Sequence, residues 1–217
     1  MYAHSQQTVN RNGYLPSVLR TFALSLGIAF IGTMVGSFVP PALFLPLMIL
    51  EVGMLIFAFF LRRKKMISYS FLFAFTFISG MTTYPIVAQY LATVGPNPVL
   101  LALASTTTVF TGIAIYASTT KRDFTFLGGM LMAALLALIA ISIFSIFWPL
   151  SSTGMLAFSF IGVLVFSGYV LYDFNRMKHY GVSAEEVPLM ALNLYLDFVN
   201  LFINLLRIFG ILSSKED

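Results

Sequence analysis

Five polar side chains recur through the last apolar stretch of the chain, residues 187–212. They are Asn193, Asp197, Asn200, Asn204 and Arg207. Spacings of four, three, four and three residues place them on one helical stripe about 80° wide. The other faces of this stretch are Leu, Ile, Phe, Val and Met, so the stripe must face a protein interior or a wet cavity. Its carboxylate and amide oxygens are candidates for binding a cation or sharing a proton.

The composition is that of a membrane protein. The chain has 217 residues, of which 59% are hydrophobic and 9% are charged, and its mean hydropathy is +0.93. A soluble domain carries about 25% charged residues, and long uncharged apolar runs are typical of membrane spans. The absence of cysteine excludes disulfides, thiolate catalysis and cysteine-ligated metals. The net charge of +4 is concentrated in loops, which indicates membrane orientation and not nucleic-acid binding.

Seven apolar stretches predict an all-α membrane protein, a bundle of seven helices. The stretches are residues 18–39, 42–61, 67–92, 99–118, 124–147, 153–175 and 187–212. A polar N-terminal segment, residues 1–16, precedes a single transmembrane domain, residues 17–217. Gly32 and Gly36 in the first stretch form a small-xxx-small pair, which allows close contact with another helix.

The loop charges predict the orientation. The loops after the first, third and fifth stretches contain no charged residue, whereas those after the second, fourth and sixth contain basic residues (62–65, 121–122, 176 and 178). By the positive-inside rule the N-terminus is cytoplasmic, and we expect a multi-pass protein of the bacterial plasma membrane. Whether the last stretch crosses the membrane fully stays open.

Few ionisable residues lie within the stretches, and each is costly, about 2.5–3.5 kcal/mol for a charge near the bilayer centre. They are Glu51, Asp173, Asp197 and Arg207, with Arg20 and Arg62 near the inner edges of the first and second stretches. A polar face also follows the sixth stretch through Ser159, Gly162, Phe166, Tyr169 and Asp173. We expect these faces to share one interior lined by carboxylates and amides.

Asp173 and Asp197 are the candidates for a coupled pair, because they lie on consecutive membrane helices. Two carboxylates in a low-dielectric site cannot both ionise cheaply, so such a pair shares one proton and can sense pH. Asp197 lies about 15 Å into the last helix, so the two meet only if its first turns sit at the membrane interface. Arg62 is at the right depth to pair with Asp173.

Three segments carry a family resemblance. They are Leu171-Tyr172-Asp173, Asn193-Leu-Tyr-Leu-Asp197-Phe and Asn200-Leu-Phe-Ile-Asn204-Leu-Leu-Arg207. They resemble the transmembrane Bax inhibitor motif family, and Pro-Leu-Met-Ile-Leu-Glu51 with the Arg62–Lys65 loop is similar to its small bacterial members. The resemblance covers nearly the whole chain. It implies six helices wrapped around a central, hydrophobic seventh.

The resemblance also implies a function, a pH-sensitive calcium leak that acid favours. It makes Asp173 and Asp197 the pH sensor, Arg62 a latch for the closed state, and Glu51 an acid on the calcium path. Calcium prefers oxygen ligands. The two aspartates and Glu51 would therefore hold it transiently, with Asn193, Asn200 and Asn204 along the path. We expect no enzymatic activity, no tightly bound cofactor and a monomer whose partners are lipid, calcium and protons.

Several of these residues could instead have a purely structural role. Asn200 and Asn204 are also typical of interhelical hydrogen bonds. Arg207 is expected to reach the outer interface or to cap its helix, outside the mechanism. Arg62 could be an ordinary positive-inside anchor, and Glu51 a protonated, hydrogen-bonded acid.

Other classes of function fit less well. An intramembrane aspartyl protease needs Gly-x-Gly-Asp, whereas Leu194-Tyr195-Leu196 precedes Asp197. A retinal protein needs a lysine within a late span, and no span contains one. A proton-coupled transporter of a small solute remains the alternative, although the chain lacks visible inverted repeats. A purely structural protein would tolerate loss of both aspartates.

Overall fold

The computed structural model describes residues 11–62 and 67–214, without the side chains of residues 11, 12, 61 and 62. The described part contains seven α-helices and no strand. The helices are α1 (Leu15–Gly36), α2 (Phe44–Arg62), α3 (Tyr69–Val94), α4 (Pro96–Thr119), α5 (Leu127–Phe147), α6 (Ser152–Tyr180) and α7 (Val187–Ser213). Short 3-10 helices, Arg11–Tyr14, Pro41–Leu43 and Ala184–Glu186, precede α1, α2 and α7.

Each of the seven helices is long and apolar enough to cross a membrane, which confirms the predicted all-α membrane fold. Local sequence signals set their limits. Proline lies in the first turn of α1, α4 and α7, where its missing N–H costs nothing. Gly95 and Gly181, with φ of 80° and 69°, end α3 and α6, since a left-handed φ favours glycine.

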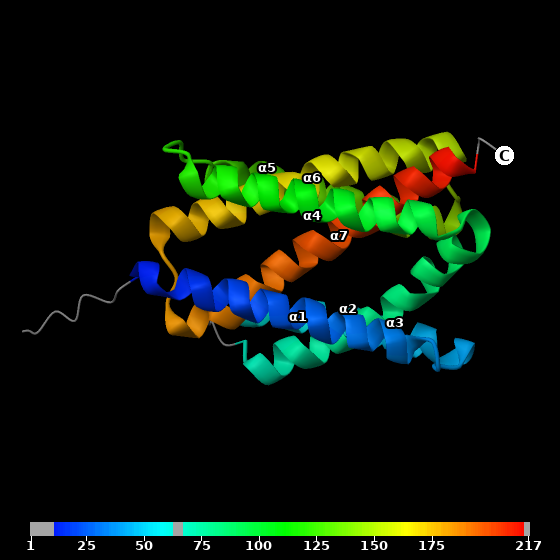
Figure 1. The fold of residues 1–217 in the computed structure, drawn as a ribbon, viewed down its shortest axis with the longest axis horizontal. Coiled ribbons are helices and arrows are strands. Elements are labelled where there is room, and N and C mark those ends of the chain that lie inside the picture. The colour runs from blue at the N-terminus through cyan, green and yellow to red at the C-terminus, as the bar shows by residue number, and fades with distance from the viewer. Residues whose placement is uncertain (1–10, 63–66, 215–217) are drawn as a thin grey trace, which may run out of the picture.

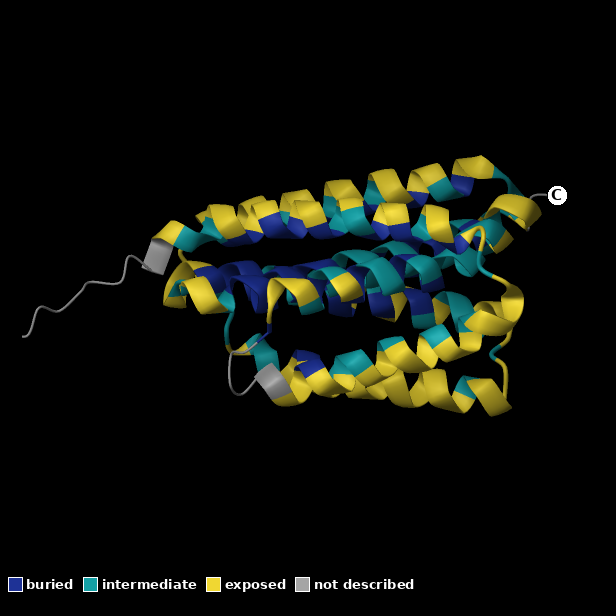
Figure 2. Cartoon of the chain, turned by 90° about the horizontal axis from the view of Figure 1, so that it is seen from below, coloured by how far each residue is buried: buried dark blue, intermediate teal, exposed yellow. Residues whose placement is uncertain are grey.

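Helix α7 lies at the centre of the bundle (Figure 1). It runs diagonally between a layer that contains α1 and α3 and a layer that contains α4, α5 and α6. In its most apolar window 61% of the residues are buried, against 33% or less in every other helix. It packs most extensively on α6 and α4, and also on α1 and α3. Figure 2 shows the buried residues concentrated in the middle of the bundle. The predicted central C-terminal helix is confirmed.

The last helix traverses the whole bundle. It is continuous over 27 residues, about 40 Å at 1.5 Å per residue, which exceeds the roughly 30 Å hydrocarbon thickness of a bilayer. It begins at the end of the bundle where α1 begins and finishes at the opposite end, beside the C-terminus (Figure 1). The structure therefore favours full crossing over a re-entrant segment.

The most extensive helix contact joins α1 to α3, and glycines make it close. A Cβ on Gly32 would overlap the Phe77 carbonyl of α3. A Cβ on Gly80 would overlap the Ala29 carbonyl of α1. Thr33 donates a hydrogen bond of 3.0 Å to the Gly80 carbonyl across the same contact. The small-xxx-small pair of α1 thus marks a helix interface, as predicted.

Candidate functional site

A cavity of about 450 Å³ lies beside α7 and is lined by residues of α2, α5, α6 and α7. Its polar lining residues are Tyr169, Asp173, Asn193, Asp197 and Asn200. The rest of its wall is apolar, and α5 contributes only Met132, Leu135, Leu136 and Ile139. A mostly apolar pocket with a few convergent polar groups is the usual form of a functional site.

The structure brings Asp173 of α6 and Asp197 of α7 into the wall of this one cavity. Their side chains are 3% and 5% exposed. Helix α6 continues past Asp173 to Tyr180, and the first turns of α7, from Val187, are already buried. Because α7 begins at that end of the bundle, its third turn reaches the depth of Asp173. Asp173 and Asp197 therefore lie at a similar depth in the bundle, as their pairing requires.

Two of the three predicted amides also line the cavity, and one does not. Asn193 and Asn200 are lining residues, and the Asn193 side-chain nitrogen is buried with no hydrogen-bond acceptor among the described residues. Asn204 lies instead against Gly162 of α6, where an added Cβ would overlap its amide. Only Asn193 and Asn200 can therefore act on a ligand in this cavity.

The expected interhelical hydrogen bonds of Asn200 and Asn204 are not found among the described residues. The Asn200 amide donates to the Leu196 carbonyl at 2.8 Å, and the Asn204 amide donates to the Asn200 carbonyl at 2.7 Å. Both bonds run to the preceding turn of α7 itself. The prediction was wrong because the helix offers these short amides an acceptor closer than any neighbouring helix.

Glu51 belongs to a different polar site. Thr82 of α3 donates a hydrogen bond of 2.5 Å to its carboxylate, and Glu51 is not a lining residue of the cavity. Within residues 11–62 and 67–214 no group of three or more Asp, Glu, His or Cys side chains is placed to hold a metal ion. The expected common interior is thus divided, and Glu51 does not join the two aspartates as a third ligand.

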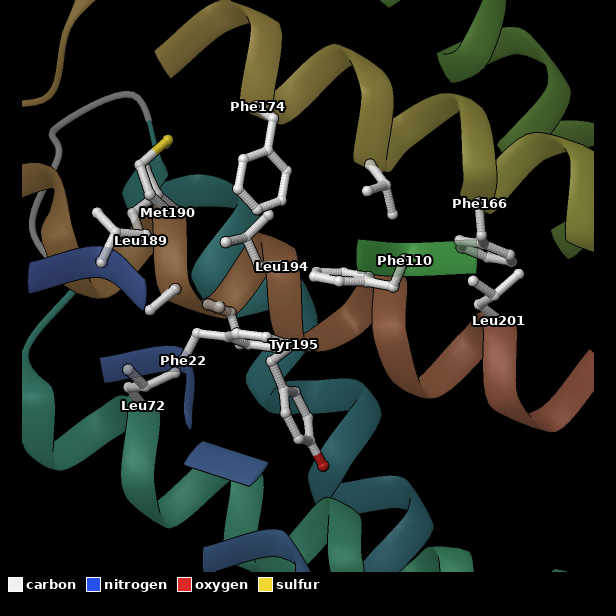
Figure 3. Close-up of a cluster of buried hydrophobic side chains, with 14 of the residues drawn as sticks. Phe22, Leu72, Phe110, Phe166, Phe174, Leu189, Met190, Leu194, Tyr195 and Leu201 are labelled. Carbon is white, nitrogen blue, oxygen red and sulfur yellow. The ribbon is translucent and has the colours of Figure 1, made fainter. Parts of the chain in front are cut away.

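A column of hydroxyl groups on α3 completes the Glu51 site, and our sequence reasoning missed it. Thr76, Ser79 and Thr82 follow one another at intervals of three residues and are buried. The Tyr195 hydroxyl of α7 donates a hydrogen bond of 3.5 Å to the Thr76 carbonyl and lies near Ser79 and Glu51. Figure 3 shows the Tyr195 ring extending from α7 on the side away from Phe174. The three-residue spacing within an apolar stretch was the available signal.

The structure describes the side chain of only one of the two predicted basic residues, Arg207. The backbone of Arg62 ends α2, but its side chain lies outside the described residues, so its latch role stays a prediction. Arg207 is partly buried near Tyr90 of α3 and is not a lining residue of the cavity. Its position agrees with a role outside the mechanism.

A second cavity, of about 880 Å³, adjoins the first at the end of the bundle where α7 begins. Tyr169 and Met132 line both cavities. The wall of the second also includes Tyr172, Arg176 and Glu186. Polar and charged groups therefore lead from this end of the bundle toward the aspartates.

The loop between α4 and α5 is tied to α6 at the same end. The Asn175 side chain accepts from the Phe124 amide at 2.8 Å and donates to the Arg122 carbonyl at 2.9 Å. Lys178 donates to the Thr120 carbonyl at 2.6 Å. In this loop, hydrogen bonds from the Thr125 hydroxyl and amide lower the pKa of the exposed Asp123.

The fold and the cavity define a class, a multi-pass helical membrane protein with two buried carboxylates beside a central helix. Comparison with known proteins gives the family. The model of the family described as "Inhibitor of apoptosis-promoting Bax1" matches residues 11–214. The chain belongs to this Bax inhibitor family, which confirms the resemblance.

Relatives come from bacteria, yeast and a virus. An uncharacterised protein of Campylobacter jejuni is 34% identical over 93% of this chain and 90% of its own length. Bax inhibitor 1 of Schizosaccharomyces pombe is 36% identical over 69% of this chain and 54% of its own length. A Golgi anti-apoptotic protein of vaccinia virus is 37% identical over 81% and 71%, respectively. The similarity therefore extends to proteins whose names refer to apoptosis.

Proposed function

We propose that this protein is a pH-sensitive calcium leak channel, with Asp173 and Asp197 as its proton sensor. One observation carries the proposal, the presence of both buried carboxylates in the wall of one cavity beside the central helix. Charged groups in a membrane interior are costly and typically mark an ion path or a proton relay. A site with a purely structural role would not need both acids in a cavity.

The cavity offers the ligand chemistry that calcium requires. Calcium binds six to eight oxygens and accepts water among them. The two carboxylates and the amide oxygens of Asn193 and Asn200 supply some of these, and water supplies the rest. A partial ligand set suits a permeant ion, which must bind weakly enough to leave.

Proton sharing provides the gate in this proposal. When the two carboxylates share one proton, they hold α6 and α7 together and α7 blocks the path. A change in protonation alters that contact, and the helix ends move to a second packing. Acid favours the leak, as the family resemblance implies. Arg62 acts as the latch, and Glu51 lies farther along the calcium path.

The protein lies in the bacterial plasma membrane with its N-terminus in the cytoplasm, and the charge distribution supports this. Arg122, Arg176 and Lys178 lie at the same end of the bundle as the start of α1. That end is cytoplasmic by the positive-inside rule. The second cavity then lies on the cytoplasmic side, and it shares the lining residues Tyr169 and Met132 with the aspartate cavity.

Calcium efflux from proteoliposomes tests the proposal. The purified chain is reconstituted with a trapped calcium indicator, and the flux is followed from about pH 5 to about pH 8. We expect flux that rises as pH falls, and its pH dependence is lost in the double variant Asp173→Asn with Asp197→Asn. Asp123→Asn removes an exposed carboxylate at the same end and serves as the matched control.

Three outcomes would contradict the proposal. Flux no greater than that of empty liposomes would exclude a leak. An unchanged pH profile in the double variant would exclude the aspartates as the sensor. Flux that needs a second solute on the opposite side would identify a proton-coupled transporter instead.

A further inference from the structure

The aspartate cavity combines two acidic side chains with a largely apolar lining. Asp173 and Asp197 lie on α6 and α7, whereas the described side chains that α2 and α5 contribute are all apolar. They are Leu55, Ile56, Ala58, Phe59, Met132, Leu135, Leu136 and Ile139. A bare calcium ion has no use for so large an apolar wall, because calcium seeks oxygen ligands. The wall therefore needs an explanation of its own.

Several of these wall residues are largely exposed. Ile56 and Phe59 of α2 are 54% and 57% exposed, and Leu136 and Ile139 of α5 are 58% and 46% exposed. Leu136 and Ile139 lie near the middle of α5 (Leu127–Phe147). At that depth the surface of a membrane protein meets lipid chains and not water. The cavity thus borders the bilayer where α2 and α5 face each other.

The two helices at this border are held by different neighbours. Helix α2 packs chiefly on α3, and α5 packs chiefly on α6. Both are among the least buried helices, with 6% and 11% of their apolar windows buried. They can therefore separate slightly without disturbing the packing of α7. A molecule dissolved in the bilayer could enter between them.

We propose that this cavity binds a cationic amphiphile that enters from the membrane, such as a long-chain amine. The ammonium group lies at Asp173 and Asp197, where the buried carboxylates complement its charge. The alkyl chain lies between α2 and α5 against the apolar wall. The volume of about 450 Å³ is within the roughly 300–1,000 Å³ of small-molecule sites. This ligand site does not require that the chain conduct calcium.

Photolabelling of the full chain in nanodiscs of zwitterionic phosphatidylcholine tests the site. The probe is an alkylamine that carries a diazirine on its chain, used in calcium-free buffer, and the labelled residues are mapped by mass spectrometry. Dodecylamine and dodecanol serve as competitors of equal chain length. We expect labels on the α2 and α5 wall residues and competition at least about tenfold stronger by the amine, which corresponds to about 1.4 kcal/mol.

Variants separate the charge of the site from its apolar wall. Asp173→Asn with Asp197→Asn should weaken competition by the amine to that of the alcohol, and Asp197→Asn alone provides a milder variant if the double variant folds poorly. Asp123→Asn removes an exposed carboxylate that does not line the cavity and should leave binding unchanged. Leu136→Trp, at the membrane border, should reduce labelling by the amine while both carboxylates remain.

Equal competition by amine and alcohol would overturn the proposal, and so would amine binding that survives loss of both aspartates. Labels confined to residues outside the cavity would also overturn it. Because binding is measured without calcium, amine binding in a protein that shows no calcium flux would contradict only the leak. A calcium leak without amine binding would contradict only this ligand site.

Discussion

The two sides of α7 hold acidic side chains in different ways. On the side of α3, Glu51 accepts a short hydrogen bond from Thr82, and Tyr195 packs edge-on against Phe75 at a ring separation of 6.2 Å. On the opposite side, Asp173 and Asp197 line a cavity whose α2 and α5 walls are apolar. Glu51 lies against α3, and the two aspartates lie in the wall of a cavity.

The difference predicts which property of the protein depends most on each side. Buried polar groups in packed regions must have partners, because leaving one unsatisfied costs about 1–3 kcal/mol. The Thr82 hydroxyl of α3 provides such a partner for the half-buried Glu51. A cavity beside the aspartates gives room for a ligand and for a change in packing. We therefore expect changes on the α3 side to affect stability first, and changes on the cavity side to affect ion flux first.

Gly32→Ala should give the largest loss of stability, because α1 and α3 are closest there. The added methyl group would overlap the Phe77 carbonyl and come within 3.3 Å of the Gly80 Cα. Two backbones must separate, at a cost of about 3 kcal/mol or more. Gly27→Ala in the same helix is the control, since no described atom outside the helix backbone lies within 4 Å of its new methyl group. Thermal unfolding in detergent measures both, and equal stability of the two variants would refute close packing at this contact.

Thr82→Val should give a smaller loss, about 1–3 kcal/mol, because it removes the donor to Glu51 and keeps the side-chain shape. Thr107→Val is the control, since the exposed Thr107 hydroxyl bonds only to its own helix at Leu103. The same unfolding assay applies. If Thr82→Val were as stable as Thr107→Val, the α3 side would not depend on this partner.

Asp123→Asn should give the smallest effect, present near neutral pH and lost in acid. Hydrogen bonds from Thr125 lower the pKa of Asp123 in the folded state. Its contribution to stability is therefore present above its unfolded pKa, about 3.9, and is lost as pH falls through the lowered folded pKa. Unfolding at about pH 7 should show a small loss in the variant, and the difference should vanish in strong acid. A difference that persists unchanged at the lowest pH would contradict this assignment.

The sequence predicted the arrangement of the helices better than the partners of their polar groups. Apolar length alone located seven spans, and the polar stripe of α7 indicated a face turned to an interior. The central position of this helix was implied by the family resemblance. The spacing of Gly32 and Gly36 indicated a close helix contact. These features depend on periodicity along one helix, which the sequence displays directly.

Contacts between helices were harder to predict. The sequence suggested one interior shared by Glu51 and the two aspartates, whereas the structure turns Glu51 toward Thr82. The rotation of α2 about its own axis determines which neighbours Glu51 faces. Because α2 is apolar on nearly every side, its sequence does not indicate that rotation. Likewise the Asn200 and Asn204 amides donate to backbone carbonyls of α7 itself. The spacing of residues along the helix does not indicate which acceptor a side chain binds.

Calcium efflux as a function of pH in four matched proteoliposome preparations tests the central claim most directly. They contain the natural chain, Asp173→Asn, Asp197→Asn and Glu51→Gln. If the two aspartates share one proton, either aspartate variant alone should abolish the pH dependence, while Glu51→Gln should keep its midpoint and alter only the rate. A normal midpoint in both aspartate variants, or its loss in Glu51→Gln alone, would contradict the account.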